Sequence, residues 1–293
     1  MGQFDYEGFR VHYDEYGSGD RPIVLIHGLL MNRLMFGRIA PELAERGNRV
    51  ICIDLLGHGE SDRPEDLLRY SMPLFARQTA ALLDHLGLEQ AVIGGTSLGA
   101  NVTLETAVNH PDRVRAMFIE MPVLDNALAA VAAIFGPMFL GLRFGRPLME
   151  VVSRLTSMIP RSNLMVDMVL DWLRQEPGPS ISVLEGLLLG ETAPHKEERC
   201  KLTQPALIVG HSGDPLHPFN DSGMLAEELQ DARLVNANSI LEWRITPDRL
   251  DDELAFFLDD VWSQPQASSR QRREEQPKDL ERPERAQAAG GEA

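Results

Sequence analysis

The sequence has few cysteines, no excess of basic residues and no long apolar run. Cys52 and Cys200 are its only cysteines, too few for a disulfide framework, so nothing implies an oxidising compartment. No apolar stretch reaches the roughly 18 residues that a membrane-spanning helix needs. Residues 1–7 lack the charged and apolar parts of a signal peptide. These absences predict a soluble cytoplasmic protein with no membrane span.

The charge balance and the motif inventory exclude several kinds of partner. The 44 acidic residues outnumber the 28 basic ones, which gives a formal net charge of −16. A nucleic-acid partner is therefore not expected, because binding it needs a basic surface that neutralises phosphates. No His/Cys cluster has the spacing of metal ligands, and no G-x-G-x-x-G follows a predicted strand. We therefore expect neither a metal nor any other cofactor.

Predicted strands and helices alternate through most of the chain after an N-terminal hairpin over residues 4–16. The strands are expected over residues 23–26, 49–53, 91–94, 114–119, 206–209 and 233–235, and the helices over residues 34–45, 71–85, 98–109 and 248–261. Such alternation favours an α/β fold, a mostly parallel sheet with helices on both faces.

The alternation stops between residues 125 and 199, where methionine and phenylalanine are frequent between proline and glycine residues. We predict a helical lid there that lines an apolar pocket, since methionine adapts to irregular apolar ligands. The core is then formed by residues 1–124 and 200–263. Residues 264–293 show no apolar periodicity and are predicted to be a disordered charged tail.

A possible nucleophile lies in residues 95–99, Gly-Thr-Ser-Leu-Gly, which match G-x-S-x-G between a predicted strand and a predicted helix. A tight strand-to-helix turn needs small residues on both sides of the serine, and it lifts the hydroxyl clear of the sheet. The turn also puts Ser97 at a helix N-terminus, where free N–H groups favour developing negative charge. Ser97 is therefore the candidate nucleophile.

With this motif and three further stretches, the chain resembles the α/β-hydrolase superfamily. Residues 25–29 look like the His-Gly turn that follows a strand in that family. Residues 54–62 look like the glycine-rich loop after the next strand, and residues 208–215 like the strand end that carries the triad acid. For His27 and His58, which belong to the first two stretches, we expect structural, hydrogen-bonded roles.

The resemblance covers about residues 4–262 and implies an α/β-hydrolase fold with defined site residues. It assigns Ser97 as the nucleophile and Asp214 as the acid of a catalytic triad. It also implies an oxyanion hole formed by the backbone N–H groups of Leu29 and Leu98. Such donors stabilise the charge that appears only in the tetrahedral intermediate.

The sequence departs from the family at the triad histidine, which usually follows the last strand. Residues 234–244 hold no histidine, and none occurs after His217. His217, on the loop of the predicted acid, is the best replacement base, and its alternative role is that of a rim histidine. His211 and His195 are further candidates. Asp125 is an alternative acid, although a helix N-cap is the role we favour for it.

These features predict a serine-dependent hydrolase, esterase- or lipase-like, that acts on a carboxylic ester or related acyl bond of a hydrophobic small molecule. The alternative is a catalytically weak or inactive member of the fold that binds an apolar small molecule or a protein partner. A serine hydroxyl is a poor nucleophile without a positioned base. An imidazole within hydrogen-bond reach of Ser97 therefore separates the two hypotheses.

Overall fold

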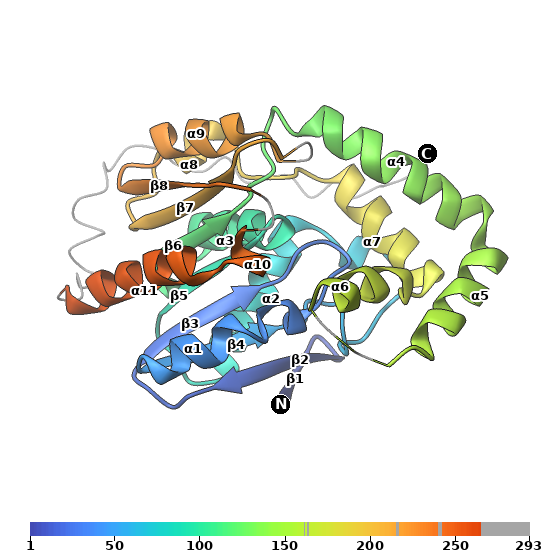
Figure 1. The fold of residues 1–293 in the computed structure, drawn as a ribbon, viewed down its shortest axis with the longest axis horizontal. Helices are drawn as coiled ribbons and strands as arrows, with labels where there is room; N and C mark the ends of the chain where they lie inside the picture. Colours follow the sequence, from blue (N-terminus) through green and yellow to red (C-terminus); the bar gives the residue numbers. More distant parts are fainter. Residues whose placement is uncertain (161, 163, 215–216, 240–241, 265–293) are drawn as a thin grey trace, which may run out of the picture. The chain divides into compact units, whose positions relative to one another are not determined.

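The computed structural model describes residues 1–160, 162, 164–214, 217–239 and 242–264 (Figure 1). Met1–Ser263 form one compact unit. The predicted tail, residues 264–293, lies outside the described residues except for Gln264, so its disorder stays a prediction.

An eight-stranded sheet with the order β1-β2-β4-β3-β5-β6-β7-β8 lies at the centre of the unit. Its strands are β1 (Gly2–Tyr6), β2 (Phe9–Tyr16), β3 (Arg21–Ile26), β4 (Asn48–Ile53), β5 (Ala91–Thr96), β6 (Val114–Glu120), β7 (Ala206–His211) and β8 (Ala232–Ala237). β1 and β2 pair antiparallel, as do β2 and β4, and the other pairs are parallel. The loops that follow β3, β5, β6 and β7 therefore leave the sheet at the same edge.

Helices cover both faces of this sheet, as the sequence predicted (Figure 1). The core helical elements are η1 (Arg33–Phe36), α1 (Ile39–Glu45), η2 (Leu67–Arg69), α2 (Met72–His85), α3 (Leu98–Asn109), η3 (Pro111–Arg113), α8 (Lys196–Arg199), α9 (Phe219–Glu228), α10 (Glu242–Ile245) and α11 (Asp248–Ser263). Side chains alternate along a strand, so Ile23 and Leu25 pack with α1 and α11, whereas Val24 and Ile26 pack with α2 and α3. This explains the continuous apolar sequence of β3.

The segment between β6 and β7 is largely helical. It contains α4 (Leu128–Phe144), α5 (Arg146–Ser157), α6 (Leu164–Leu173) and α7 (Pro177–Leu189), which we call the helical insertion (Figure 1). α4 and α5 pack on α7, and α7 packs on η2 of the core. Among the described residues no single helix is long and apolar enough to cross a membrane. Only α4 and α5 taken together are long and apolar enough, and this pair is bent by 100°.

Two helical segments differ from the prediction. The helix expected over residues 34–45 is split, because the Asn32 side chain accepts the Leu34 N–H and starts a 3₁₀ turn that ends at Gly37. α9 was not predicted. Its inner face carries Asp221 and Ser222, both buried, and these polar residues interrupt the apolar periodicity that indicates a helix.

A buried ion-pair network joins the loops after β3 and β4. The Arg33 guanidinium donates to Asp54, to Asp14 Oδ2 at 2.9 Å and to Glu60 Oε2 at 2.8 Å. Asp54 also accepts the backbone N–H of Arg33 at 2.7 Å and that of Glu60 at 2.9 Å. Burial opposes the charge of Arg33, but the carboxylates of Asp54 and Asp14 outweigh it and raise the pKa of the guanidinium.

Arg33→Met should lower the free energy of unfolding by about 3–5 kcal/mol, because it leaves the fully buried Asp54 without its countercharge. Arg21→Met is the matched control, since it removes an ion pair to Asp259 that is exposed and should contribute about 1 kcal/mol or less. Urea unfolding of the two variants measures the difference. Equal losses in both would show that the buried network has no special role.

Candidate active site

Ser97 lies in a sharp turn between β5 and α3, with φ +55° and ψ −110°. A positive φ is strained for a residue with a side chain, and here it turns the chain abruptly into the helix. A Cβ atom at Gly95 or at Gly99 would collide with the carbonyl oxygen of Ile26. The two glycines of the motif therefore let the turn pack directly against β3, which is why small residues are required there.

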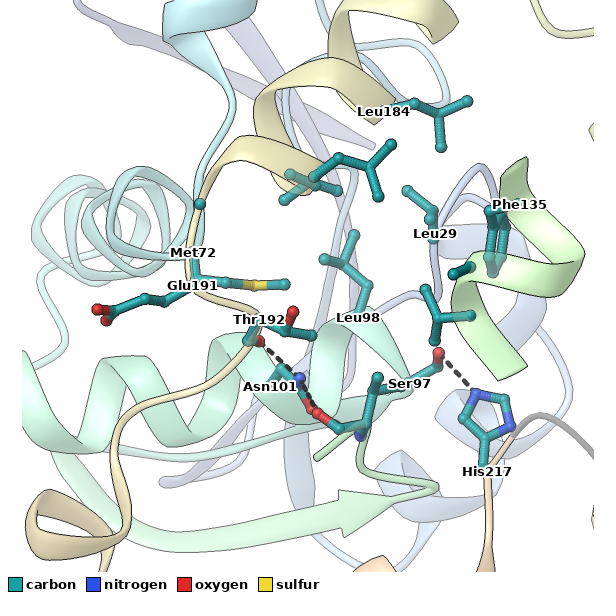
Figure 2. A pocket seen from close by; sticks show the side chains of 16 residues that line it. Leu29, Met72, Ser97, Leu98, Asn101, Phe135, Leu184, Glu191, Thr192 and His217 are labelled. Carbon is teal, nitrogen blue, oxygen red and sulfur yellow. Dashed lines mark hydrogen bonds between the residues drawn. The ribbon is translucent and has the colours of Figure 1, made fainter. Parts of the chain in front are cut away.

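The structure brings Ser97, His217 and Asp214 together in one chain of hydrogen bonds. His217 Nε2 lies 2.9 Å from Ser97 Oγ, and His217 Nδ1 lies 2.9 Å from Asp214 Oδ2 (Figure 2 shows the first contact). An ionised carboxylate only accepts, so Nδ1–H donates to Asp214 and Nε2 is left to accept the Ser97 hydroxyl proton. The Asp214 carboxylate also accepts the His217 backbone N–H at 3.0 Å. These hydrogen-bond directions are the ones that a general base requires.

The other candidate bases have different partners. His211 is buried on β7, where its Nδ1 lies 2.9 Å from the Ser239 carbonyl oxygen and its Nε2 3.2 Å from Glu120 Oε1. Both ring nitrogens of His211 are thus engaged away from Ser97. His195 is exposed and contacts Glu191. Among the described residues, no three His, Cys, Asp or Glu side chains are placed to hold a metal ion.

The expected N-cap role of Asp125 was wrong. α4 begins after Ala127 with no side-chain cap, and Asp125 is exposed. The turn is held instead by Asp221 of α9, whose Oδ2 accepts the N–H groups of Leu124 at 2.8 Å and Ala127 at 3.1 Å. The carboxylate that contacts His217 is Asp214, not Asp125.

The two residues predicted to form the oxyanion hole lie next to Ser97. Leu98 is the first residue of α3, so its N–H has no acceptor within the helix. Leu29 lines the same cavity as Ser97 (Figure 2). A Cβ atom at Gly28, the residue before it, would lie 3.9 Å from Ser97 Cβ, so this loop packs on the turn.

His27 and His58 hold the loops that carry this arrangement. His27 Nδ1 donates to the Gly28 carbonyl at 2.8 Å, and its Nε2 accepts the Leu55 N–H at 3.1 Å. His58 Nδ1 donates to the Leu56 carbonyl at 3.0 Å. Both rings are fully buried with centroids 4.7 Å apart. Burial lowers the pKa of His27, and burial together with the neighbouring His27 lowers the pKa of His58 well below its usual value.

A cavity of about 400 Å³ opens beside Ser97 and His217. Its walls are mainly apolar and come from the core and from α4 and α7, with Leu29, Met72, Leu98, Phe135, Leu184 and Leu187 among them (Figure 2). The polar contributors besides Ser97 and His217 are Asn101, Glu191 and Thr192. The helical insertion thus supplies one side of the cavity and the core the other.

Asn101 is a site residue that the sequence reasoning missed. Its Nδ2 donates to the carbonyl oxygens of Val123 and Thr192, each at 2.7 Å, and its Oδ1 accepts the Val123 N–H at 3.0 Å. Val123 precedes the helical insertion and Thr192 follows it, so one amide joins the two ends. The available signal was its position four residues after Ser97, which puts both on one side of α3.

Comparisons with known proteins agree with this architecture. A family model described as "alpha/beta hydrolase fold" matches residues 21–146. The bifunctional epoxide hydrolase 2 of Rattus norvegicus is 36% identical over 110 residues, which are 38% of this chain, but the chain spans only 20% of that relative's length. A pimeloyl-acyl-carrier-protein methyl ester esterase of Aeromonas hydrophila is 29% identical over 234 residues, covering 77% of this chain and 89% of the relative.

Among solved structures, a meta-cleavage product hydrolase from Pseudomonas fluorescens IP01 superimposes with a TM-score of 0.71. The two sequences are 21% identical, and the alignment covers 89% of this chain and 98% of the other. At this identity the likeness shows a shared fold.

Because His27 and His58 are buried, we expect the protein to lose stability in acid. Below about pH 6.5 unfolded histidines take up protons. Folded His27 and His58 resist protonation because their pKa values are lowered. The unfolded state then binds more protons, so the free energy of unfolding falls as pH falls, by up to about 1.4 kcal/mol per pH unit for each histidine.

His58→Asn should flatten this slope, because the substituted side chain does not titrate. The exposed His195→Asn is the control and should leave the slope unchanged. Urea unfolding between about pH 5.5 and 7.5, the range around the ordinary histidine pKa, measures it. A slope that is the same in His58→Asn and in the unmodified protein would contradict the role given to burial.

Proposed function

Because the chain belongs to the α/β-hydrolase superfamily, we propose that it is a serine hydrolase that cleaves a carboxylic ester or related acyl bond of a hydrophobic small molecule. The observation that carries the proposal is the pair of 2.9 Å contacts that link Ser97 to His217 and His217 to Asp214. A methyl ester esterase among the relatives, aligned over most of both chains, supports the choice of an ester.

In this mechanism Ser97 Oγ attacks the acyl carbon while His217 Nε2 removes the hydroxyl proton. The Asp214 carboxylate holds the imidazole orientation and stabilises the imidazolium that forms. His217 then gives the proton to the leaving alcohol, and the acyl group stays on Ser97. Water, activated by the same imidazole, hydrolyses the acyl-enzyme and restores the hydroxyl. The N–H groups of Leu29 and Leu98 would stabilise the oxyanion in both steps.

The cavity supports a hydrophobic substrate. Its volume of about 400 Å³ suits a small molecule, and apolar side chains of α4 and α7 face the core across it. We propose that the helical insertion acts as a lid, because side chains of α4 and α7 line the cavity that holds Ser97. The contact between His217 and Ser97 favours an enzyme over a protein that only binds its ligand. A protein that only binds a ligand does not need an imidazole placed to accept the serine proton.

His217→Ala tests the proposal. We expect kcat/KM for a p-nitrophenyl ester with a short acyl chain to fall by a factor of about 10² or more, because the general base is lost. Binding of an apolar, non-hydrolysable analogue should change little, since the imidazole acts on the transition state.

His195→Ala is the matched control, because this histidine is exposed and contacts Glu191 rather than Ser97. It should keep the full rate. A His217→Ala variant that folds and keeps the full rate would refute the assignment of the base. Loss of rate in both variants would indicate a general effect on the protein instead.

A further inference from the structure

We propose that the outer face of α4 and α5 docks on the surface of a lipid bilayer that carries anionic headgroups. The outer face is defined by the exposed apolar side chains of Leu140, Phe144, Leu148, Val151, Leu155 and Met158. This interaction goes beyond the proposed hydrolysis and does not depend on it. Three observations support it: α5 presents its apolar side to the solvent, the corner between α4 and α5 is exposed, and the charged side chains of this region are mainly basic.

α5 presents apolar residues to the solvent. Leu148, Val151 and Leu155 are 67%, 51% and 59% exposed, and helical spacing puts them on one face. The opposite side holds Ser153, which is buried and donates to the Arg174 carbonyl at 2.8 Å. A surface helix of a globular protein normally has its apolar stripe on the core. Here a well-formed apolar stripe of α5 has no cover among the described residues.

The corner between α4 and α5 extends this apolar surface. Figure 1 shows the corner at which α4 turns into α5. The chain is bent by 100° there, and Phe144, at the end of α4, is 82% exposed. Eight of the fifteen large apolar side chains that are exposed among the described residues lie within residues 134–159. Single exposed apolar side chains are ordinary, but a contiguous group marks an interaction site.

The charge of this region selects an anionic surface. Residues 128–160 contain Arg143, Arg146 and Arg154 against one acid, Glu150, in a chain whose net charge is −16. Arg146 pairs with Glu150, whereas Arg143 and Arg154 are exposed and have no ion pair among the described residues. An apolar stripe flanked by arginines is the arrangement by which amphipathic helices lie in the bilayer interface. Two copies joined through this face would bring their arginines together, so a lipid surface fits better.

The outer face lies on the side of α4 that points away from the cavity. Val131 and Phe135, on the inner side of α4, line the cavity beside Ser97. Docking would therefore set the helices that cover the cavity against the lipid. If the proposed hydrolysis also holds, apolar substrates could pass to Ser97 from the bilayer.

Flotation of the full chain with lipid vesicles tests the proposal. The protein should float with vesicles of phosphatidylcholine and phosphatidylglycerol in equal parts, and much less with phosphatidylcholine alone. Leu148→Asp combined with Leu155→Asp should weaken partitioning at least about tenfold, because two apolar anchors are lost. Arg143→Gln combined with Arg154→Gln should weaken it by a similar factor on the anionic vesicles only.

Phe256→Asp, at an exposed position of α11, is the matched control and should float like the unmodified protein. Ser97→Ala should also float normally, so that failure of docking and failure of hydrolysis are distinguishable. Unchanged melting temperatures would show that the exposed substitutions leave the fold intact. The proposal is overturned if the unmodified protein does not float with anionic vesicles, or if the double aspartate variant floats equally well. Dissociation of a dimer by that variant, without flotation of the unmodified protein, would assign the face to a second copy.

Discussion

The strained backbone of Ser97 is the constraint on which the surrounding structure depends. A positive φ at a residue with a side chain costs about 1–3 kcal/mol and persists only where the surroundings fix it. Here the Ser97 N–H donates to the Glu120 carbonyl at 2.8 Å, the Asn101 N–H donates back to the Ser97 carbonyl at 3.1 Å, and the flanking glycines pack against Ile26. β5, β6 and β3 together hold the turn, so the hydroxyl has a defined position relative to every loop at that edge of the sheet.

Buried polar groups then fix those loops around the turn. His27 and the Arg33–Asp54 pair join the loop after β3 to the loop after β4, and this keeps Leu29 beside Ser97. Asn101 and Asp221 do the same for the helical insertion, the first by joining its two ends and the second by holding its first turn. Each group is buried and hydrogen-bonded, so its removal would cost stability. The cavity is therefore shaped by polar contacts beneath an apolar lining.

The fold could be predicted from the sequence because its signals are local. The buried run of β3 and the Gly-Thr-Ser-Leu-Gly turn each specify their own conformation, and together they give the α/β-hydrolase architecture. His217 was identified only as a replacement base. It lies 120 positions after Ser97 in the sequence, and their contact is visible only in the folded chain. Asn101 and Asp221 were not identified at all. A buried polar residue interrupts an apolar pattern, and its partner is visible only once distant segments are assembled.

If Ser97 is a nucleophile activated by His217, a reagent that reacts with activated serines should label it covalently. The protein is treated with a fluorophosphonate, and the modified peptide is identified by mass spectrometry. We expect a single adduct on Ser97, absent in Ser97→Ala and formed more slowly in His217→Ala. Labelling that persists in Ser97→Ala, or a folded protein that resists labelling altogether, would contradict it.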